Sequence, residues 1–167
     1  MIKNKQMKNV LMILLMLFII KSTFAENPKR RIISLEKVSF DTIIEDYYIN
    51  YTIGNNKNIV KTFFKNSDTT YYYDRTLILS IKYRDMNILQ NKEFTKMDFK
   101  FHFTNNDDDI NKYCIQSIDI DKINKDFISF IVTLCIPDTD LYYDFPFIVY
   151  NDSSIIIKKP LEEEYED

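Results

Sequence analysis

The chain has 167 residues and a formal net charge of −3, and it contains one glycine and one histidine. A single glycine excludes phosphate-binding loops, dinucleotide-binding motifs and nucleophile elbows, which need several glycines at fixed spacing. A single histidine excludes metal sites made of several histidines. The acidic balance argues against nucleic acid as a partner, because phosphate binding requires clustered Lys and Arg.

The first 25 residues have the pattern of a secretory signal peptide. Three lysines and no acidic residue precede an unbroken apolar run from Val10 to Ile20, and the segment ends Thr23-Phe24-Ala25. A run of 11 apolar residues is too short for a membrane-spanning helix, which needs about 20. The small residues at the −3 and −1 positions favour cleavage after Ala25. We therefore expect no permanent membrane span and a secreted, periplasmic or cell-surface location.

We expect a single domain over 26–160, followed by an acidic, flexible tail over 161–167. Loss of the leader removes four lysines and no acidic residue, so the formal net charge of the mature chain becomes −7. The mature chain of 142 residues can bury about two-thirds of its unfolded surface. It can therefore fold around its own core, and we expect no cofactor.

Alternation of apolar and polar residues is the main pattern of the mature chain, and it predicts an all-β fold. In the segment 95–104, Phe99 and Phe101 are expected to share a buried face, and His102 to lie on the polar face. The segment 85–94 lacks clear alternation, so we expect a short helical turn or a loop there. Strands are expected at 31–40, 46–53, 58–65, 70–83, 95–104, 112–120, 127–136, 142–150 and 154–158.

Eight to nine short strands joined by polar turns favour an antiparallel two-layer β-sandwich, immunoglobulin-like or C2-like in arrangement. The alternative is a closed barrel. The segment 127–136 is apolar on both faces, which is typical of a central strand that is packed on both sides. We therefore favour the sandwich.

Cys114 and Cys135 are predicted to form a cross-strand disulfide. If the strand at 112–120 turns back into the strand at 127–136 through a loop centred on 124–125, the two cysteines are directly opposite each other. Opposed Cβ atoms are then about 4.5 Å apart, near the upper limit for a disulfide, and disulfides persist in exported proteins. The alternative is a pair of free, buried thiols.

Two acidic turns, 105–109 and 138–140, are a candidate calcium site. Because the chain reverses at each turn of an antiparallel sheet, both turns are expected at the same end of the domain. Calcium prefers carboxylate and carbonyl oxygens, although Asp and Asn are also common in turns without any metal. The candidate metal ligands are Asp107, Asp108, Asp109, Asp138 and Asp140.

Tyrosines are concentrated in two runs, Tyr71–Tyr73 and Tyr142–Tyr143. Exposed tyrosines can stack on sugars or anchor a protein interface. Tyrosine is also a common strand residue that needs no functional explanation. Both interpretations stay open from the sequence.

The residues form no recognised catalytic motif, so we predict no catalytic residues and a non-catalytic binding or interaction domain of the periplasm or cell surface. A protein or glycan of the cell envelope is the expected partner, bound through loop ends or an exposed sheet edge. A calcium-binding C2-like sandwich and a hydrolase using paired carboxylates are the alternatives. A subunit of a larger envelope assembly is a third.

Overall fold

The computed structural model describes residues 31–63, 69–103 and 109–161. Two units are distinguished, Met1–Arg31 and Ile32–Asp167, and every strand named below belongs to the second. The predicted signal peptide and the end of the predicted tail lie outside the described residues. No helix within the three described ranges is long and apolar enough to span a membrane.

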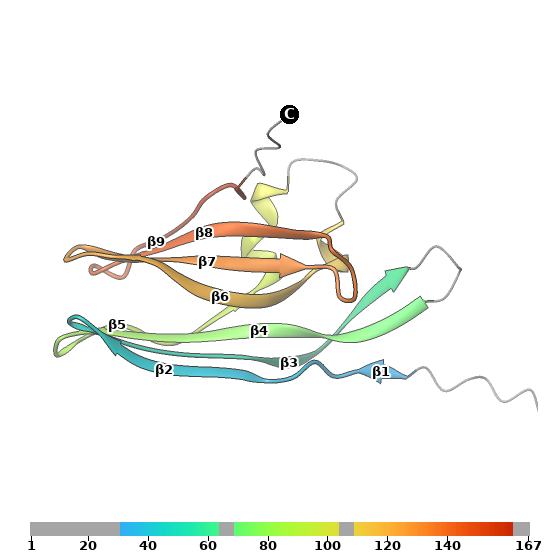
Figure 1. Ribbon diagram of the computed structural model, residues 1–167, viewed down its shortest axis with the longest axis horizontal. Coiled ribbons are helices and arrows are strands. Elements are labelled where there is room, and N and C mark those ends of the chain that lie inside the picture. The colour runs from blue at the N-terminus through green and yellow to red at the C-terminus, as the bar shows by residue number, and fades with distance from the viewer. Residues whose placement is uncertain (1–30, 64–68, 104–108, 162–167) are drawn as a thin grey trace, which may run out of the picture. The chain divides into compact units, whose positions relative to one another are not determined.

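The first sheet is formed by the N-terminal part of the second unit. Its strands are β1 (Ile32–Ile33), β2 (Val38–Ile44), β3 (Tyr47–Phe63), β4 (Thr69–Tyr83) and β5 (Met86–Thr95). β3 pairs with β2 on one side and with β4 on the other, both antiparallel. β4 pairs on its far side with β5, antiparallel, and with the short β1, parallel. Figure 1 shows this sheet as the lower layer.

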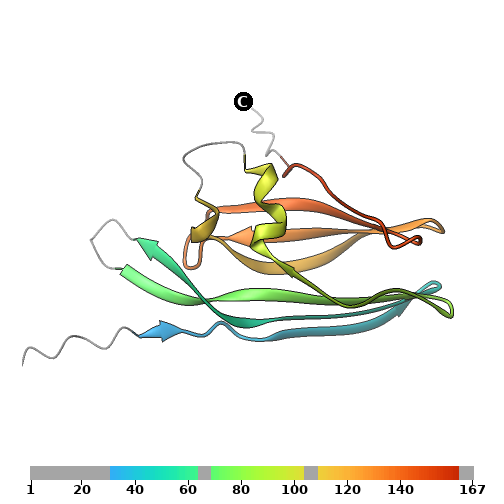
Figure 2. The same ribbon diagram turned by 180° about the vertical axis from the view of Figure 1, so that it is seen from behind.

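Two short 3-10 helices and a second sheet follow along the chain. They are η1 (Lys96–His102) and η2 (Ile110–Lys112), then β6 (Cys114–Ile123), β7 (Phe127–Cys135), β8 (Tyr142–Tyr150) and β9 (Ile155–Ile157). The four strands are antiparallel and lie in chain order. The prediction of a central strand within 127–136 is therefore confirmed. Figure 2 shows η1 where the chain passes from one sheet to the other.

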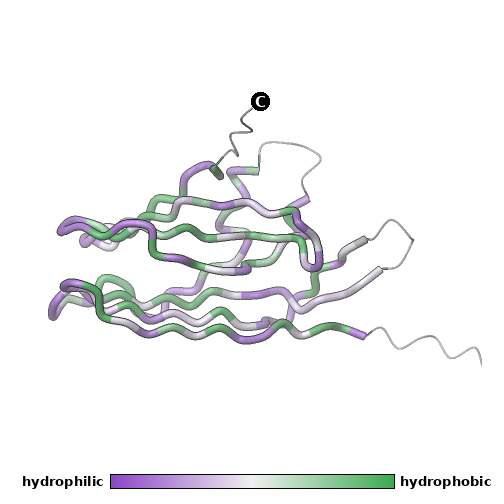
Figure 3. Tube along the Cα trace, viewed as in Figure 1, coloured by the Kyte–Doolittle hydropathy of each residue, from purple (hydrophilic) through white to green (hydrophobic). Residues whose placement is uncertain are grey.

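The two sheets face one another and enclose a common hydrophobic core. Figure 3 shows apolar and polar positions alternating along the strands of both layers. Phe147 of β8 is fully buried, and its ring centroid lies 4.9 Å from that of Phe94 on β5 and 6.2 Å from that of Phe130 on β7. The chain thus has the all-β, sandwich-like fold that the alternation predicts.

The order of the strands differs from the expected immunoglobulin-like arrangement. Immunoglobulin-like sandwiches have Greek-key connections, in which the chain passes between strands that are not neighbours in one sheet. Here β2 to β5 form one antiparallel meander, and β6 to β9 form another. Each half of the unit completes its own sheet, because the strands of each meander pair with their neighbours in the chain.

The prediction of a strand at 95–104 is wrong, because most of this segment forms η1. The Asp98 carboxylate accepts a hydrogen bond from the backbone N–H of Thr95 at 2.7 Å and so caps the first turn. Residues two apart in a helix do not share a face. Phe99 is therefore completely buried, whereas Phe101 is 91% exposed.

The structure also differs from the expectations for the segment 85–94 and for His102. The segment 85–94, expected as a turn or loop, contributes most of β5. Its pairing with β4 contains two register irregularities, which remove the regular alternation that a sequence-based prediction requires. His102 lies at the end of η1 and is partly buried, with its ring centroid 6.3 Å from that of Phe145.

β3 joins the two strands that were expected on either side of the Gly-Asn-Asn-Lys segment 54–57. The chain does not turn there but continues through a β-bulge. The pair Asn55–Arg75 is followed by the pair Ile59–Tyr73, so β3 has extra residues opposite a single position of β4. Bulges bend a strand and redirect side chains, and this bulge lies beside the candidate site described below.

Substitution of two phenylalanines tests the helical conformation of η1. Phe99→Ala should lower the free energy of unfolding by about 3–5 kcal/mol, because a fully buried ring is replaced by a cavity. Phe101→Ala should change it by less than about 0.5 kcal/mol, because its ring lies in solvent. Urea denaturation of both variants measures the difference. Equal losses would place both rings on one buried face, as in a strand, and would contradict the structure.

Candidate functional site

Two consecutive charged residues of β4, Asp74 and Arg75, are buried at one end of the core. In a regular strand, consecutive side chains point to opposite faces of the sheet. The buried positions of β4 are odd-numbered from Arg75 onward but even-numbered before it, at Tyr72 and Asp74. The change occurs opposite the bulge in β3. Both charges therefore reach the interior.

Lys96 of η1 compensates the buried charge of Asp74. Its Nζ atom lies 3.1 Å from Asp74 Oδ2 and donates hydrogen bonds to the carbonyl oxygens of Asn111 and Tyr113. The two ionic side chains are only 7% and 4% exposed. Buried charges require such pairing and hydrogen bonding, so this ion pair fixes η1 and η2 against β4.

Arg75 connects the first sheet to the second. Its Nη1 atom donates hydrogen bonds to the carbonyl oxygens of Ile115 and Gln116 on β6, and Nη2 donates to the carbonyl oxygen of Glu36. Its Nε atom is buried without a hydrogen-bond partner among the described residues, and burial lowers the pKa of the guanidinium. The result is a fixed cation beside the start of β6.

Asp74, Arg75 and Lys96 are not among the residues that the sequence marks as a candidate site. One signal was available: the charged pair Asp74-Arg75 interrupts the expected strand 70–83. A charged pair within a strand must be exposed or must be compensated inside the protein, and the sequence alone cannot distinguish these cases. Lys96 gave no signal, because its expected strand placed it among solvent-facing residues.

The structure confirms the predicted pairing of Cys114 with Cys135, which are directly opposite each other in the β6–β7 ladder. The turn differs from the expected one. The Asn124 side-chain oxygen closes it by accepting hydrogen bonds from the N–H groups of Asp126 and Phe127. Two register shifts then follow along the ladder before the cysteines meet. The pairing is therefore correct, although the simple hairpin from which it was derived is not.

The two cysteines are free thiols in different surroundings, so the predicted disulfide is not formed in this structure. Cys114 is completely buried and packs with Val60 and Tyr72. Cys135 is partly exposed, and its thiol donates a hydrogen bond to Gln116 Oε1 at 3.5 Å. Only Cys135 is open to molecules in solution.

The local charges make the two thiols unequal. A hydrogen bond donated by Cys114 to Cys135, followed by burial, raises the pKa of Cys114. The same hydrogen bond, followed by the charge of Arg75, lowers the pKa of Cys135 against the opposing effects of burial and of Asp138. Cys135 is thus the member of the pair that ionises first.

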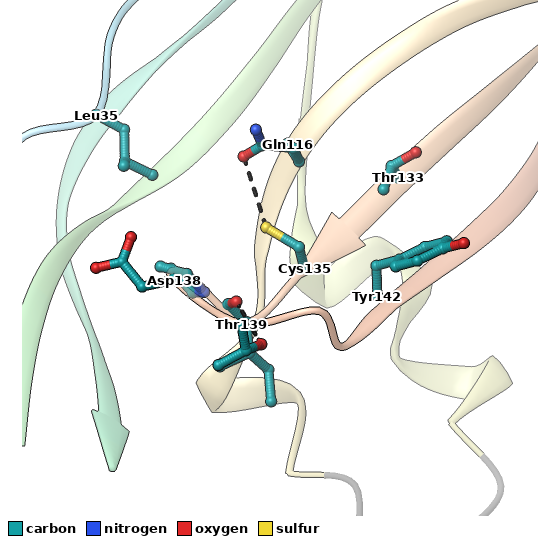
Figure 4. A pocket seen from close by; sticks show the side chains of 9 residues that line it. Leu35, Gln116, Thr133, Cys135, Asp138, Thr139 and Tyr142 are labelled. Atoms are coloured by element: carbon teal, nitrogen blue, oxygen red, sulfur yellow. Dashed lines mark hydrogen bonds between the residues drawn. The ribbon is translucent and has the colours of Figure 1, made fainter. Parts of the chain in front are cut away.

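Cys135 lines a pocket of about 320 Å³ at this end of the second sheet. Figure 4 shows its sulfur directed toward Gln116, with Leu35 and Asp138 on one side of the pocket and Tyr142 on the other. The remaining lining residues are Thr133, Ile136, Pro137 and Thr139. The volume lies at the lower end of the range for small-molecule sites.

Asp138, a predicted metal ligand, has a structural partner in Tyr72. The Tyr72 hydroxyl donates a hydrogen bond to the Asp138 carboxylate. Burial, together with this hydrogen bond and the carboxylate charge, raises the pKa of Tyr72 to about 12. The neutral phenol therefore links β4 to the turn between β7 and β8 at all physiological pH values.

The other predicted calcium ligands are not assembled in the part of the chain that is described. Asp109 begins η2, and its Oδ1 atom accepts hydrogen bonds from the backbone and side-chain amides of Asn111. Asp140 is exposed. Within the described ranges, no group of three His, Cys, Asp or Glu side chains could hold a metal ion. Asp107 and Asp108 lie outside those ranges, so a calcium site that includes them stays a prediction.

A second candidate surface is β2, which forms an edge of the first sheet among the described strands. Val38, Phe40 and Ile44 face the same side as the β3 residues with which they pair, which are buried or partly buried in the core, yet they are 39%, 40% and 36% exposed. The second sheet does not cover them, because β6 lies against β3 and β4 and β8 packs on β5. Ile43, on the opposite face, is 74% exposed. The core is open along β2.

Removal of the Lys96 charge tests the buried ion pair. Lys96→Met should lower the free energy of unfolding by about 3–5 kcal/mol, because Asp74 stays buried without its countercharge. The matched control is Arg84→Met, which breaks the exposed ion pair with Asp46 and should leave stability almost unchanged. Urea denaturation measures both variants. A Lys96→Met protein as stable as the control would show that the ion pair does not hold η1 in place.

The sequence of the chain matches a known protein family. Residues 21–157 match the family described as "Domain of unknown function (DUF4738)", a region that includes all nine strands named above. A search of curated proteins found no match to the chain. Because the matched region covers well over half of the sequence, the chain belongs to the DUF4738 family.

Proposed function

We propose that the chain is an exported, non-catalytic binding domain that recruits a protein of the cell envelope through strand β2. In this binding mode, an extended segment of the partner adds one strand to the edge of a sheet. Main-chain hydrogen bonds supply affinity, and alternate side chains of the added strand supply specificity. The observation that carries the proposal is the open core along β2.

The open side of the core has the chemistry that strand addition requires. Val38, Phe40 and Ile44 form an apolar strip beside the covered part of the core. The Phe40 ring stacks on the Tyr51 ring with 5.2 Å between centroids, so this strip is held in place before any partner arrives. A partner strand with apolar residues at alternate positions would cover the strip and continue the core by one strand.

β2 lacks the features that usually prevent strand addition. Natural edge strands are commonly protected by Lys, Pro or a β-bulge. The sequence of β2 contains no Lys or Pro, and its pairing with β3 is regular over all seven residues. Asp41 is its one charged residue. A regular, apolar and accessible edge of this length supports a binding role.

Export is the second part of the proposal, and the sequence supports it. The lysine-rich start, the short apolar run and the small residues before Ala25 form the three regions of a signal peptide. The family match begins at residue 21, after the apolar run from Val10 to Ile20. An exported chain would meet its partner in the cell envelope or outside the cell.

The calcium-binding C2-like sandwich and the carboxylate hydrolase have less support. Both need acidic side chains that converge on one point. Asp109 is engaged in the start of η2, and Asp138 is engaged with Tyr72. The carboxylates of Asp109 and Asp138 thus serve local structure.

Export predicts a defined N-terminus. The protein recovered from its producing cells should begin at Glu26, because cleavage after Ala25 removes the leader. Intact mass measurement and N-terminal sequencing of the periplasmic or secreted fraction check this. Recovery only from the cytoplasm, with the first 25 residues retained, would contradict export.

A charge placed in the apolar strip tests strand addition. Phe40→Lys should reduce recovery of the partner from the envelope fraction at least about tenfold, because the lysine would be buried under the added strand. Phe101→Lys is the matched control, since Phe101 is an exposed aromatic residue on η1 and not on β2. Quantitative mass spectrometry of proteins captured by the wild type and by both variants gives the ratio.

Each outcome of this experiment is informative. Melting curves of both variants first establish that the fold is intact. Loss of the same proteins with Phe40→Lys and Phe101→Lys, or with neither, would contradict binding through β2. One contrary result in sedimentation analysis would be a wild-type dimer that the Phe40→Lys substitution dissociates. This result would identify a second copy of the chain as the strand donor, and it would contradict the proposal that the partner is a different protein.

A further inference from the structure

We propose that Cys135 is a reactive thiol whose pocket admits a small disulfide, and that Cys114 resolves the resulting mixed disulfide into a reversible Cys114–Cys135 bridge. This inference does not depend on strand addition at β2, which involves a different edge and different residues. It assigns the pocket a chemical class of ligand and gives the two cysteines separate roles.

The backbone places the two cysteines directly opposite each other, while their thiols are still free. Directly opposed residues of antiparallel strands have Cβ atoms about 4.5–5.5 Å apart, and a disulfide needs about 3.5–4.5 Å. Cys114 and Cys135 form the last pair of the β6–β7 ladder, and a register shift follows one residue later, between Ile115 and Ser117. At the end of a ladder, beside a register shift, the backbone can move enough to bring the two Cβ atoms within the range for a disulfide.

Access fixes the order of the two steps. Cys135 lines the pocket, whereas Cys114 is completely buried behind it. A disulfide in solution can therefore reach Cys135 but not Cys114. Once Cys135 carries the ligand, the opposed Cys114 thiol is the neighbouring group on its own ladder. Cys135 is the attacking thiol and Cys114 the resolving one.

The charges around the two cysteines also favour reaction of Cys135 before Cys114. The hydrogen bond from the Cys114 thiol favours the thiolate of Cys135, and the Arg75 guanidinium favours it further against the effect of burial. Asp138, on the pocket side, opposes this effect on Cys135, and Asp74 opposes ionisation of Cys114. The thiolate is the nucleophile in thiol–disulfide exchange, so the accessible sulfur is also the more reactive one.

The chemistry balances with a low-molecular-mass disulfide, written R–S–S–R, as the oxidant. The Cys135 thiolate attacks one sulfur of the oxidant, the S–S bond breaks, and one R–S⁻ leaves. Cys114 then loses its proton to the first R–S⁻ and attacks the Cys135 sulfur, and the second R–S⁻ leaves. The proton that Cys135 released to solvent on ionisation converts this second R–S⁻ to a thiol. Two electrons pass from the cysteines to the oxidant, and the products are the bridge and two R–SH molecules.

The pocket suits a small polar disulfide such as oxidised glutathione. Its volume of about 320 Å³ admits one half of such a molecule next to the sulfur. The side-chain amide of Gln116 lines it and can bind amino-acid polar groups. The hydroxyl groups of Thr133 and Thr139 also line it, and they donate hydrogen bonds to Asp144 and to the carbonyl oxygen of Ile136. Leu35 and Pro137 offer apolar contact on the other walls.

Oxidation of the reduced exported protein tests the proposal. The native protein is treated with oxidised glutathione at neutral pH, and peptide mapping by mass spectrometry follows each cysteine. The expected sequence is a transient glutathione adduct on Cys135, then loss of the adduct with formation of the Cys114–Cys135 bridge. Dithiothreitol should restore both thiols without denaturant. The bridged form should melt roughly 5–10 °C above the reduced form.

Variants separate the two roles. Cys114→Ala should stop at the mixed disulfide on Cys135, and Cys135→Ser should leave Cys114 unmodified until the chain is unfolded. Peptide mapping of the wild type serves as the second readout if a variant does not fold. A first adduct on Cys114, a stable wild-type adduct on Cys135 without bridging, or two unreactive thiols in the native protein would each overturn the proposal.

Discussion

The burial of two adjacent charges, Asp74 and Arg75, is the constraint on which the rest of the structure depends. A charge buried inside a protein must be stabilised by a countercharge or by several hydrogen bonds. Asp74 forms an ion pair with Lys96, and Arg75 donates hydrogen bonds to carbonyl oxygens of β6 and of Glu36. These partners come from the second sheet, from η1 and from the segment before β2. The charges are therefore satisfied only when the sheets adopt one relative position, which apolar contact alone would not specify.

The opposite end of the sheets is fixed by a separate polar contact. The Tyr47 hydroxyl of β3 lies 2.7 Å from Asn151 Oδ1 and 3.1 Å from the carbonyl oxygen of Asn124, both in turns of the second sheet. Fixed at both ends, the second sheet stays above β3, β4 and β5 and leaves β2 uncovered. The same arrangement places the Arg75 cation beside the cysteine pair. The binding edge and the thiol pocket thus both follow from how the two sheets are held together.

Alternation of apolar and polar residues predicts the two-sheet fold, but it does not predict every segment correctly. The central strand at 127–136 follows from its apolar residues and is confirmed. The two cysteines are opposite each other as predicted, but two register shifts of the ladder bring them together, not the simple hairpin of the prediction. The bulge at 54–57 looks like a turn in the sequence, because Gly and Asn are turn residues. The segment 95–104 alternates like a strand, yet the Asp98 cap directs it into a helix. The sequence does not predict the site residues Asp74, Arg75 and Lys96, because their burial depends on the bulge in β3 and on η1.

Strand addition at β2 is tested most directly by hydrogen exchange of the backbone amides in the segment 38–44, measured in the free protein and in its complex with the captured partner. An open edge predicts fast exchange at alternate amides of the free protein, because their N–H groups face solvent. The same amides should become strongly protected in the complex, while the amides of β7 stay unchanged. Slow exchange along the whole of β2 in the free protein, or exchange that the partner leaves unaltered, would contradict binding through this strand.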